Sequence, residues 1–147
     1  MNQETSDTIH ATSVAIDGRG VLIMGPSGAG KSDLALRLID RGAILISDDY
    51  TTATRHDGQL LLGAPPTIAG RMEIRHLGIV DMPHVEAVPA ALAIRLDEAP
   101  QRMPETIPTI RVAGIPLPLV ALAGKEPSAP IKAELALRRF DEAKGTP

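Results

Sequence analysis

Short apolar runs separated by turn residues fill the first part of the chain, and this pattern predicts β-strands. Residues 8–16 and 20–24 are two such runs, and the Asp-Gly-Arg-Gly turn at residues 17–20 predicts a hairpin between them. If the two runs pair as antiparallel strands, counting places His10 opposite residues 25–27. A histidine there either supports phosphate chemistry or is an edge residue bonded to backbone, and the pattern leaves both open.

A helical period comes next, at residues 33–41, with four apolar side chains on one face and Gly42 as a stop. The following apolar run, residues 43–47, predicts a parallel strand that closes a right-handed β-α-β unit. It ends in two adjacent acids, Asp48 and Asp49. Ligands bind at the carboxyl ends of such strands, so we expect both acids near the start of the helix.

Adjacent residues on a strand point in opposite directions, so Asp48 and Asp49 are expected to have different roles. One carboxylate can accept a proton from an attacking hydroxyl, and the other can hold magnesium directly or through water. The structural alternative is that the pair only starts a turn or caps a helix.

The middle of the chain predicts a second hairpin and a further strand. The hairpin spans residues 50–62 around Asp57-Gly58, and the strand covers residues 88–96. Residues 71–81 mix charged and aliphatic positions too densely for a plain core strand. This segment is either an amphipathic edge or a second part of the functional site.

Proline and a capping serine organise the last third of the chain. Five prolines between residues 100 and 118 restrict any strand there to a short or edge strand. A last helix is expected from Ser128, its N-cap, to about residue 143. Its expected buried anchors are Ile131, Leu135 and Phe140.

The segment between the second predicted strand and the first helix matches the phosphate-loop pattern G-x-x-x-x-G-K-[ST]. Its glycines let successive backbone N–H groups point inward at an oligophosphate. The lysine can reach the outer phosphates, and the serine hydroxyl can bind magnesium. The residues predicted to bind the nucleotide are Gly25, Pro26, Ser27, Gly28, Ala29, Gly30, Lys31 and Ser32.

Composition narrows the class of protein. A chain of 147 residues fits one domain, expected at residues 8–143 after a loose polar tail at residues 1–7. Tyr50 and Phe140 are the only aromatic residues and the net charge is −3, which argues against nucleic acid as a partner. The sequence has no cysteine and no apolar run near the ~20 residues of a membrane helix, which favours a soluble cytoplasmic protein.

Four blocks in order resemble the catalytic C-terminal domain of the bacterial HPr kinase/phosphorylase family, in the short form of α-proteobacteria. They are His10, the Gly25–Ser32 loop, Asp48-Asp49, and Glu73-Ile74-Arg75-His76-Leu77-Gly78-Ile79-Val80-Asp81. The last block is similar to the family signature E-I-R-G-L-G-I-I-D. The resemblance implies an α/β fold, a phosphate-loop domain with a mixed sheet that is similar to phosphoenolpyruvate carboxykinase.

The resemblance also implies an activity and a set of roles. The family uses ATP and Mg²⁺ to phosphorylate a serine of the phosphocarrier protein HPr, and it removes the phosphoryl group with inorganic phosphate. By resemblance, Asp48 exchanges the proton, Lys31 binds phosphates, and His10 and Arg75 support the chemistry. Ser32 and Glu73 would hold magnesium, and Asp49 is the further candidate ligand. The family also forms hexamers, which makes a homo-oligomer the expectation here.

The sequence departs from the family at two informative places. His76 stands where the signature has glycine, and no Gly-Arg-Asn block with its catalytic arginine occurs around residues 112–125. Two alternatives therefore stay open. One is a phosphate-loop kinase of a small metabolite, and the other is a regulatory module that binds a nucleotide without transferring phosphate.

Overall fold

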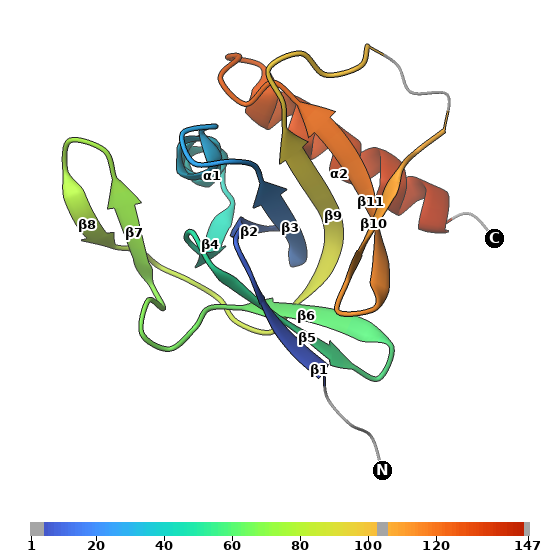
Figure 1. The fold of residues 1–147 in the computed structure, drawn as a ribbon, viewed down its shortest axis with the longest axis horizontal. Helices are drawn as coiled ribbons and strands as arrows, with labels where there is room; N and C mark the ends of the chain where they lie inside the picture. The colour runs from blue at the N-terminus through green and yellow to red at the C-terminus, as the bar shows by residue number, and fades with distance from the viewer. Residues whose placement is uncertain (1–4, 103–105, 146–147) are drawn as a thin grey trace.

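The computed structural model describes residues 5–102 and 106–145 of the chain (Figure 1). Within these residues, nine strands form one curled sheet, two strands form a separate hairpin and two helices complete the fold. The large sheet contains β1 (Thr5–Ile9), β2 (Thr12–Ile16), β3 (Arg19–Met24), β4 (Ile44–Ser47), β5 (Thr51–His56), β6 (Gln59–Gly63), β9 (Val88–Leu96), β10 (Thr109–Val112) and β11 (Ile115–Leu122). The separate hairpin contains β7 (Arg71–Ile74) and β8 (Gly78–Asp81), and the helices are α1 (Lys31–Asp40) and α2 (Ala129–Gly145).

The long strand β9 holds the sheet together because it pairs with three other strands. Its first residues pair antiparallel with β6, its middle pairs parallel with β3, and its end pairs parallel with β11. The main strand order is β1-β5-β6-β9-β3-β2-β4, and β10 joins through β11. Parallel and antiparallel pairs therefore occur in one sheet, which confirms the expected mixed α/β architecture.

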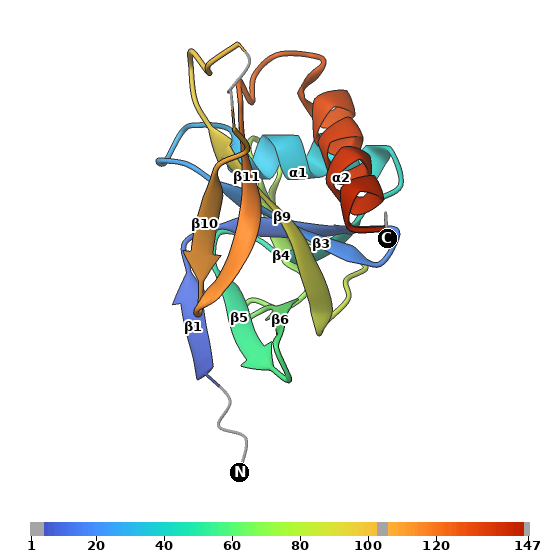
Figure 2. The same ribbon diagram turned by 90° about the vertical axis from the view of Figure 1, so that its right-hand side faces the viewer.

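Two apolar clusters fill the two faces of the sheet. One lies under the helices and includes Leu34 and Leu38 of α1, Leu137 of α2 and Ile94 of β9. The other lies inside the curl of the sheet, between strands such as β2, β6 and β11. Figure 2 shows both helices on the same side of the molecule. The observed core is aliphatic, as expected from the near absence of aromatic residues in the sequence.

An ion pair joins the two helices at the end of α1. Arg41 donates to the Glu134 carboxylate from Nε over 3.0 Å and from Nη2 over 2.8 Å. These hydrogen bonds, together with the attraction between the two charges, raise the pKa of Arg41 above its usual value. The last turn of α1 is thereby linked to the middle of α2.

Three predicted elements are confirmed. The β2–β3 hairpin pairs Ile16 with Arg19 across the predicted turn, the β5–β6 hairpin forms around Asp57 and Gly58, and β9 covers residues 88–96. Among the described residues, the proline-rich segment carries the four-residue β10 and the start of β11. Pro116 and Pro118 of β11 lie in the half of that strand that pairs with β10, and its other half pairs with β9.

The prediction of one strand over residues 8–16 is wrong, because the chain breaks at His10 and Ala11. The Ala11 N–H donates to the Ile9 carbonyl over 2.9 Å, a three-residue turn that ends β1 before β2 starts. Residues 5–7, expected in a loose tail, belong to β1 and pair with β5. The polar residues 5–7 supported no strand prediction, yet Ser6 and Thr54 join their hydroxyls across the β1–β5 pair over 3.1 Å.

The strand after α1 has the expected direction but a different neighbour. β4 pairs antiparallel with β2, and β2 pairs antiparallel with β3, so β4 runs parallel to β3 with β2 between them. β3 and β4, the two strands of the β-α-β unit, are therefore not adjacent in the sheet. β2, the hairpin partner of β3, lies between them.

The last helix buries different residues from those predicted. Ile131 and Leu135 are 44% and 52% exposed, whereas Ala129, Ala133 and Leu137 are buried and Phe140 is half-buried. Small residues let α2 approach the rest of the core closely, so the largest apolar side chains are not the anchors. Neither helix in the described ranges has the length and hydropathy of a membrane-spanning segment.

The β7–β8 hairpin extends away from the large sheet (Figure 1), and its turn is strained. Leu77 N–H donates to the Ile74 carbonyl over 3.0 Å, and His76 within this turn has a φ of 76°. A left-handed backbone places Cβ of an ordinary residue too close to the following carbonyl. Glycine avoids this contact, so the turn favours glycine at this position.

We expect His76→Gly to raise the free energy of unfolding by about 0.5–1 kcal/mol, because relief of strain exceeds the entropic cost of glycine. Urea denaturation followed by circular dichroism measures the change. Arg75→Gly is the matched control, because the φ of Arg75 is not positive and the same substitution there should destabilise the protein. A loss of stability in His76→Gly would contradict the prediction.

Candidate active site

The glycine-rich loop joins the end of β3 to the start of α1. Gly28 and Gly30 have φ angles of 84° and 98°, which glycine adopts without strain. Gly30 immediately precedes α1, and its carbonyl accepts the Leu34 N–H over 2.9 Å. The first N–H groups of a helix have no partners within the helix, so this end of α1 can bind an anion.

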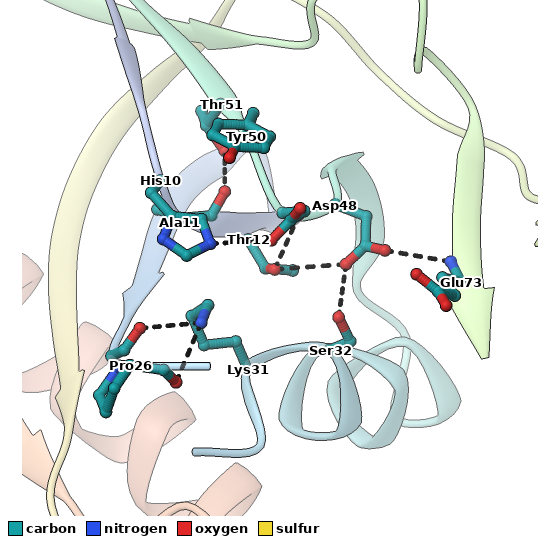
Figure 3. A network of polar contacts seen from close by, with 12 residues as sticks. His10, Ala11, Thr12, Pro26, Lys31, Ser32, Asp48, Tyr50, Thr51 and Glu73 are labelled. Atoms are coloured by element: carbon teal, nitrogen blue, oxygen red, sulfur yellow. Dashed lines mark hydrogen bonds and ion pairs between the residues drawn. The ribbon is translucent and has the colours of Figure 1, made fainter. Parts of the chain in front are cut away.

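Lys31 places its ammonium group inside this loop. Its Nζ donates to the carbonyl of Gly25 over 2.8 Å and to that of Pro26 over 3.2 Å (Figure 3). The residue is only 7% exposed. Both partners are neutral, so a phosphate oxygen can replace them and gain a stronger, charge-assisted bond.

Asp48 is the buried carboxylate of the site, with 6% of its surface exposed. Its Oδ1 accepts hydrogen bonds from Ser32 Oγ over 2.6 Å and from Thr12 Oγ1 over 3.3 Å. Its Oδ2 accepts the backbone N–H of Glu73 over 3.0 Å. Donors from α1, β2 and β7 therefore fix the orientation of one carboxylate, as Figure 3 shows.

Asp49 points to a different partner, His10. His10 Nε2 and Asp49 Oδ1 are 2.9 Å apart, and their side chains are 44% and 59% exposed. The His10 ring also lies 5.1 Å from the ring of Tyr50, between centroids. The two adjacent acids thus differ in burial and in partner, which agrees with the expectation of separate orientations.

A tight turn centred on Asp49 follows Asp48. Tyr50 N–H donates to the Asp48 carbonyl over 2.8 Å, and Asp49 between them has a φ of 69°. This is the γ-turn conformation that is rare and strained for a residue with a Cβ. The backbone strain therefore lies at Asp49, where the chain turns and directs the two carboxylates to different partners.

Glu73 and Arg75 reach the site to different degrees. The Glu73 N–H bond to Asp48 brings β7 beside β4, and the Glu73 carboxylate lies on the side that faces Asp48 and Ser32 (Figure 3). Arg75 is exposed at the turn of the β7–β8 hairpin. Among the described residues, no hydrogen bond or ion pair joins Arg75 to the other predicted site residues.

Lys125 lies near the loop, a position that the sequence pattern did not predict. Arg37 of α1 donates to the Gly124 carbonyl and, over 3.0 Å, to the Glu126 carbonyl, which holds residues 124–126 against the helix. A Cβ placed on Gly30 would lie 3.9 Å from Lys125 Cγ. In the sequence, the only signal for this position is the Gly124-Lys125 pair. The position itself depends on how the segment after β11 packs against α1.

The donor groups fit a magnesium ion that is shared with phosphates. The described residues contain no group of three or more His, Cys, Asp or Glu side chains arranged to hold a metal. Magnesium usually needs only one or two carboxylates beside phosphate oxygens and water. Ser32 and Asp48 supply a hydroxyl and a carboxylate in direct contact, and the Glu73 carboxylate faces them (Figure 3). Asp49 is bonded to His10 instead.

Comparisons with a family model and with curated proteins both find HPr kinases. The family model described as HPr Serine kinase C-terminal domain matches residues 2–95 of the chain. The HPr kinase/phosphorylase of Clostridium tetani is 39% identical over 87 residues, which are 59% of this chain and 28% of that protein. The HPr kinase/phosphorylase of Lacticaseibacillus casei is 47% identical over 76 residues, which are 51% of this chain and 24% of that protein. The chain thus spans about a quarter of the length of these curated relatives.

A solved structure matches nearly the whole fold. It is described as the structure of the Hpr(Ser) kinase/phosphatase from Coxiella burnetii, and it superposes with a TM-score of 0.83 at 30% sequence identity. The match covers 95% of this chain and 99% of that chain. The similarity therefore includes the last third of the chain, beyond the residues that the family model matches.

Proposed function

Because the chain belongs to the HPr serine kinase C-terminal domain family, we propose that it transfers the γ-phosphoryl group of ATP to a serine of HPr. The observation that carries this proposal is the buried Asp48 carboxylate, fixed by three donors next to the loop that holds Lys31. The proposal includes a phosphate-loop fold similar to phosphoenolpyruvate carboxykinase. Phosphoryl transfer needs positioning, charge neutralisation and one proton acceptor, and these residues offer all three.

The loop residues and Lys31 bind and orient the phosphates. Ser32 and Glu73 hold magnesium, which when bound neutralises the charge on the phosphate oxygens. Transfer forms a bond between the seryl oxygen and the γ-phosphorus and breaks the bond to the β,γ-bridging oxygen, so that ADP leaves. Asp48 accepts the seryl proton in this step.

The same residues support the reverse reaction. Inorganic phosphate attacks the phosphoserine, the bond between phosphorus and the seryl oxygen breaks, and pyrophosphate forms. Asp48 takes up the proton that the attacking phosphate loses and donates it to the seryl oxygen. One carboxylate therefore serves as base in one direction and as acid in the other.

Four further residues have supporting roles in this proposal. The contact between His10 and Asp49 orients the second carboxylate, whose contact with magnesium would run through water. Arg75 is exposed on the hairpin that carries Glu73, where it can meet charge on the acceptor protein. Lys125 lies beside Gly30 and provides a second cation near the phosphates.

Labelled ATP provides the test. We expect γ-labelled ATP with Mg²⁺ to label a serine of purified HPr, chelation of magnesium to stop the reaction, and added phosphate to release labelled pyrophosphate. A parallel tube contains a pool of metabolites in place of HPr. Label found only in small molecules would support a metabolite kinase, and ATP binding without transfer would support a regulatory module.

A further inference from the structure

Thr12, the first residue of β2, lies between the two adjacent acids. It is fully buried, with 0% of its surface exposed. Its hydroxyl donates to Asp48 Oδ1 over 3.3 Å (Figure 3) and accepts the backbone N–H of Asp49 over 3.1 Å. One oxygen atom thus contacts both residues of the acidic pair.

The two contacts determine where the single proton of this hydroxyl goes. The Asp49 N–H can only donate, so the Thr12 oxygen must accept from it. The Thr12 proton is then left for Asp48, whose ionised carboxylate can only accept. The β-branched side chain restricts rotation about χ1, which holds the oxygen in this position.

The contact with Asp49 also anchors the strained turn. The φ of 69° at Asp49 costs free energy, and it persists only where neighbouring groups hold it. Further buried hydroxyls fasten the same region, and their contacts are Ser47 Oγ to the Tyr50 carbonyl, Thr51 Oγ1 to the Ala11 carbonyl and Ser13 Oγ to Thr51 Oγ1. Of this group, Thr12 is the one that bonds to the Asp48 carboxylate.

We propose that Thr12 is a positioning residue that holds the Asp48 carboxylate in place for proton transfer. This inference rests on the proposed function. Ser32 also donates to Oδ1, but Ser32 is the proposed magnesium ligand and belongs to the phosphate loop. Thr12 lies outside that loop, so its loss should affect the proton-transfer step far more than nucleotide binding.

The test compares three variants in steady-state kinetics with ATP, Mg²⁺ and HPr. Thr12→Val keeps the shape and removes the hydroxyl, and it should lower kcat by about 10–100-fold while the KM for ATP stays within about threefold. Thr12→Ser restores the hydroxyl and should recover most of the rate. Ser13→Ala, which removes the next buried hydroxyl on β2, is the matched control and should keep kcat within about threefold of the unchanged chain.

Three outcomes would overturn the inference. They are an unchanged kcat in Thr12→Val, no recovery in Thr12→Ser, or an equal loss in Ser13→Ala. Thermal unfolding identifies variants that fail to fold. If Thr12→Val does not fold, Thr12→Cys replaces it in the test. Its kcat should fall in the same way, because a thiol of similar size is only a weak hydrogen-bond donor. Absence of transfer by the unchanged chain would instead contradict the proposed function itself, and the inference would fall with it.

Discussion

Replacing Asp48 with asparagine is expected to lower kcat for phosphoryl transfer by about 10²–10⁴-fold, the usual contribution of a general base. The amide has nearly the same size and still accepts the Ser32 and Thr12 hydroxyls on its oxygen. It cannot accept the seryl proton as a carboxylate does. Rapid-quench measurement of labelled HPr gives the rate, and calorimetry should show ATP affinity within about threefold of the unchanged chain.

Asp49→Asn is the matched control for this experiment. Asp49 is the adjacent acid, but it is exposed and bonded to His10, so its loss should reduce kcat much less. Asp48→Asn loses the acceptor for the Glu73 N–H, and unfolding in urea should reveal a loss of about 1 kcal/mol. Equal rate losses in the two variants would show that Asp48 is not the specific proton acceptor.

Lys31→Ala is expected to weaken ATP binding by about 10–100-fold, because bonds from a charged donor contribute about 1.5–3 kcal/mol. The ammonium group lies within the loop and bonds to the carbonyls of Gly25 and Pro26, and the substitution removes it. Isothermal titration with ATP and Mg²⁺ measures the dissociation constant.

Lys132→Ala removes the same side chain from the surface of α2. Lys132 pairs with Glu126 at an exposed position, with an N···O distance of 2.9 Å. We expect this control to keep the dissociation constant for ATP unchanged. If Lys31→Ala also left ATP affinity unchanged, the assignment of the Gly25–Ser32 loop to phosphate binding would be wrong.

Local patterns explain what the sequence predicted well. The glycine-rich loop, the β2–β3 and β5–β6 turns and the strand β9 all depend on residues within a short stretch of chain. The divergence of Asp48 and Asp49 also follows from neighbouring positions, although a γ-turn rather than simple strand alternation produces it.

Long-range packing explains what sequence reasoning missed. The place of β2 between β3 and β4 depends on pairing between distant strands. The position of Lys125 near Gly30 depends on the bonds from Arg37 to the carbonyls of Gly124 and Glu126. The buried face of α2 is lined by small residues, so choosing its largest apolar side chains as anchors failed for Ile131 and Leu135.

Arg37 has a consequence for how this fold is divided. The family model matches only as far as residue 95, yet Arg37 of α1 bonds to the carbonyls of Gly124 and Glu126. Leu122 and Leu137 share one apolar cluster with Leu34 and Ile94, which lie inside the matched region. The end of the family-model match therefore falls inside one shared apolar core, and a domain cut at residue 95 would lose packing partners of α1 and β9.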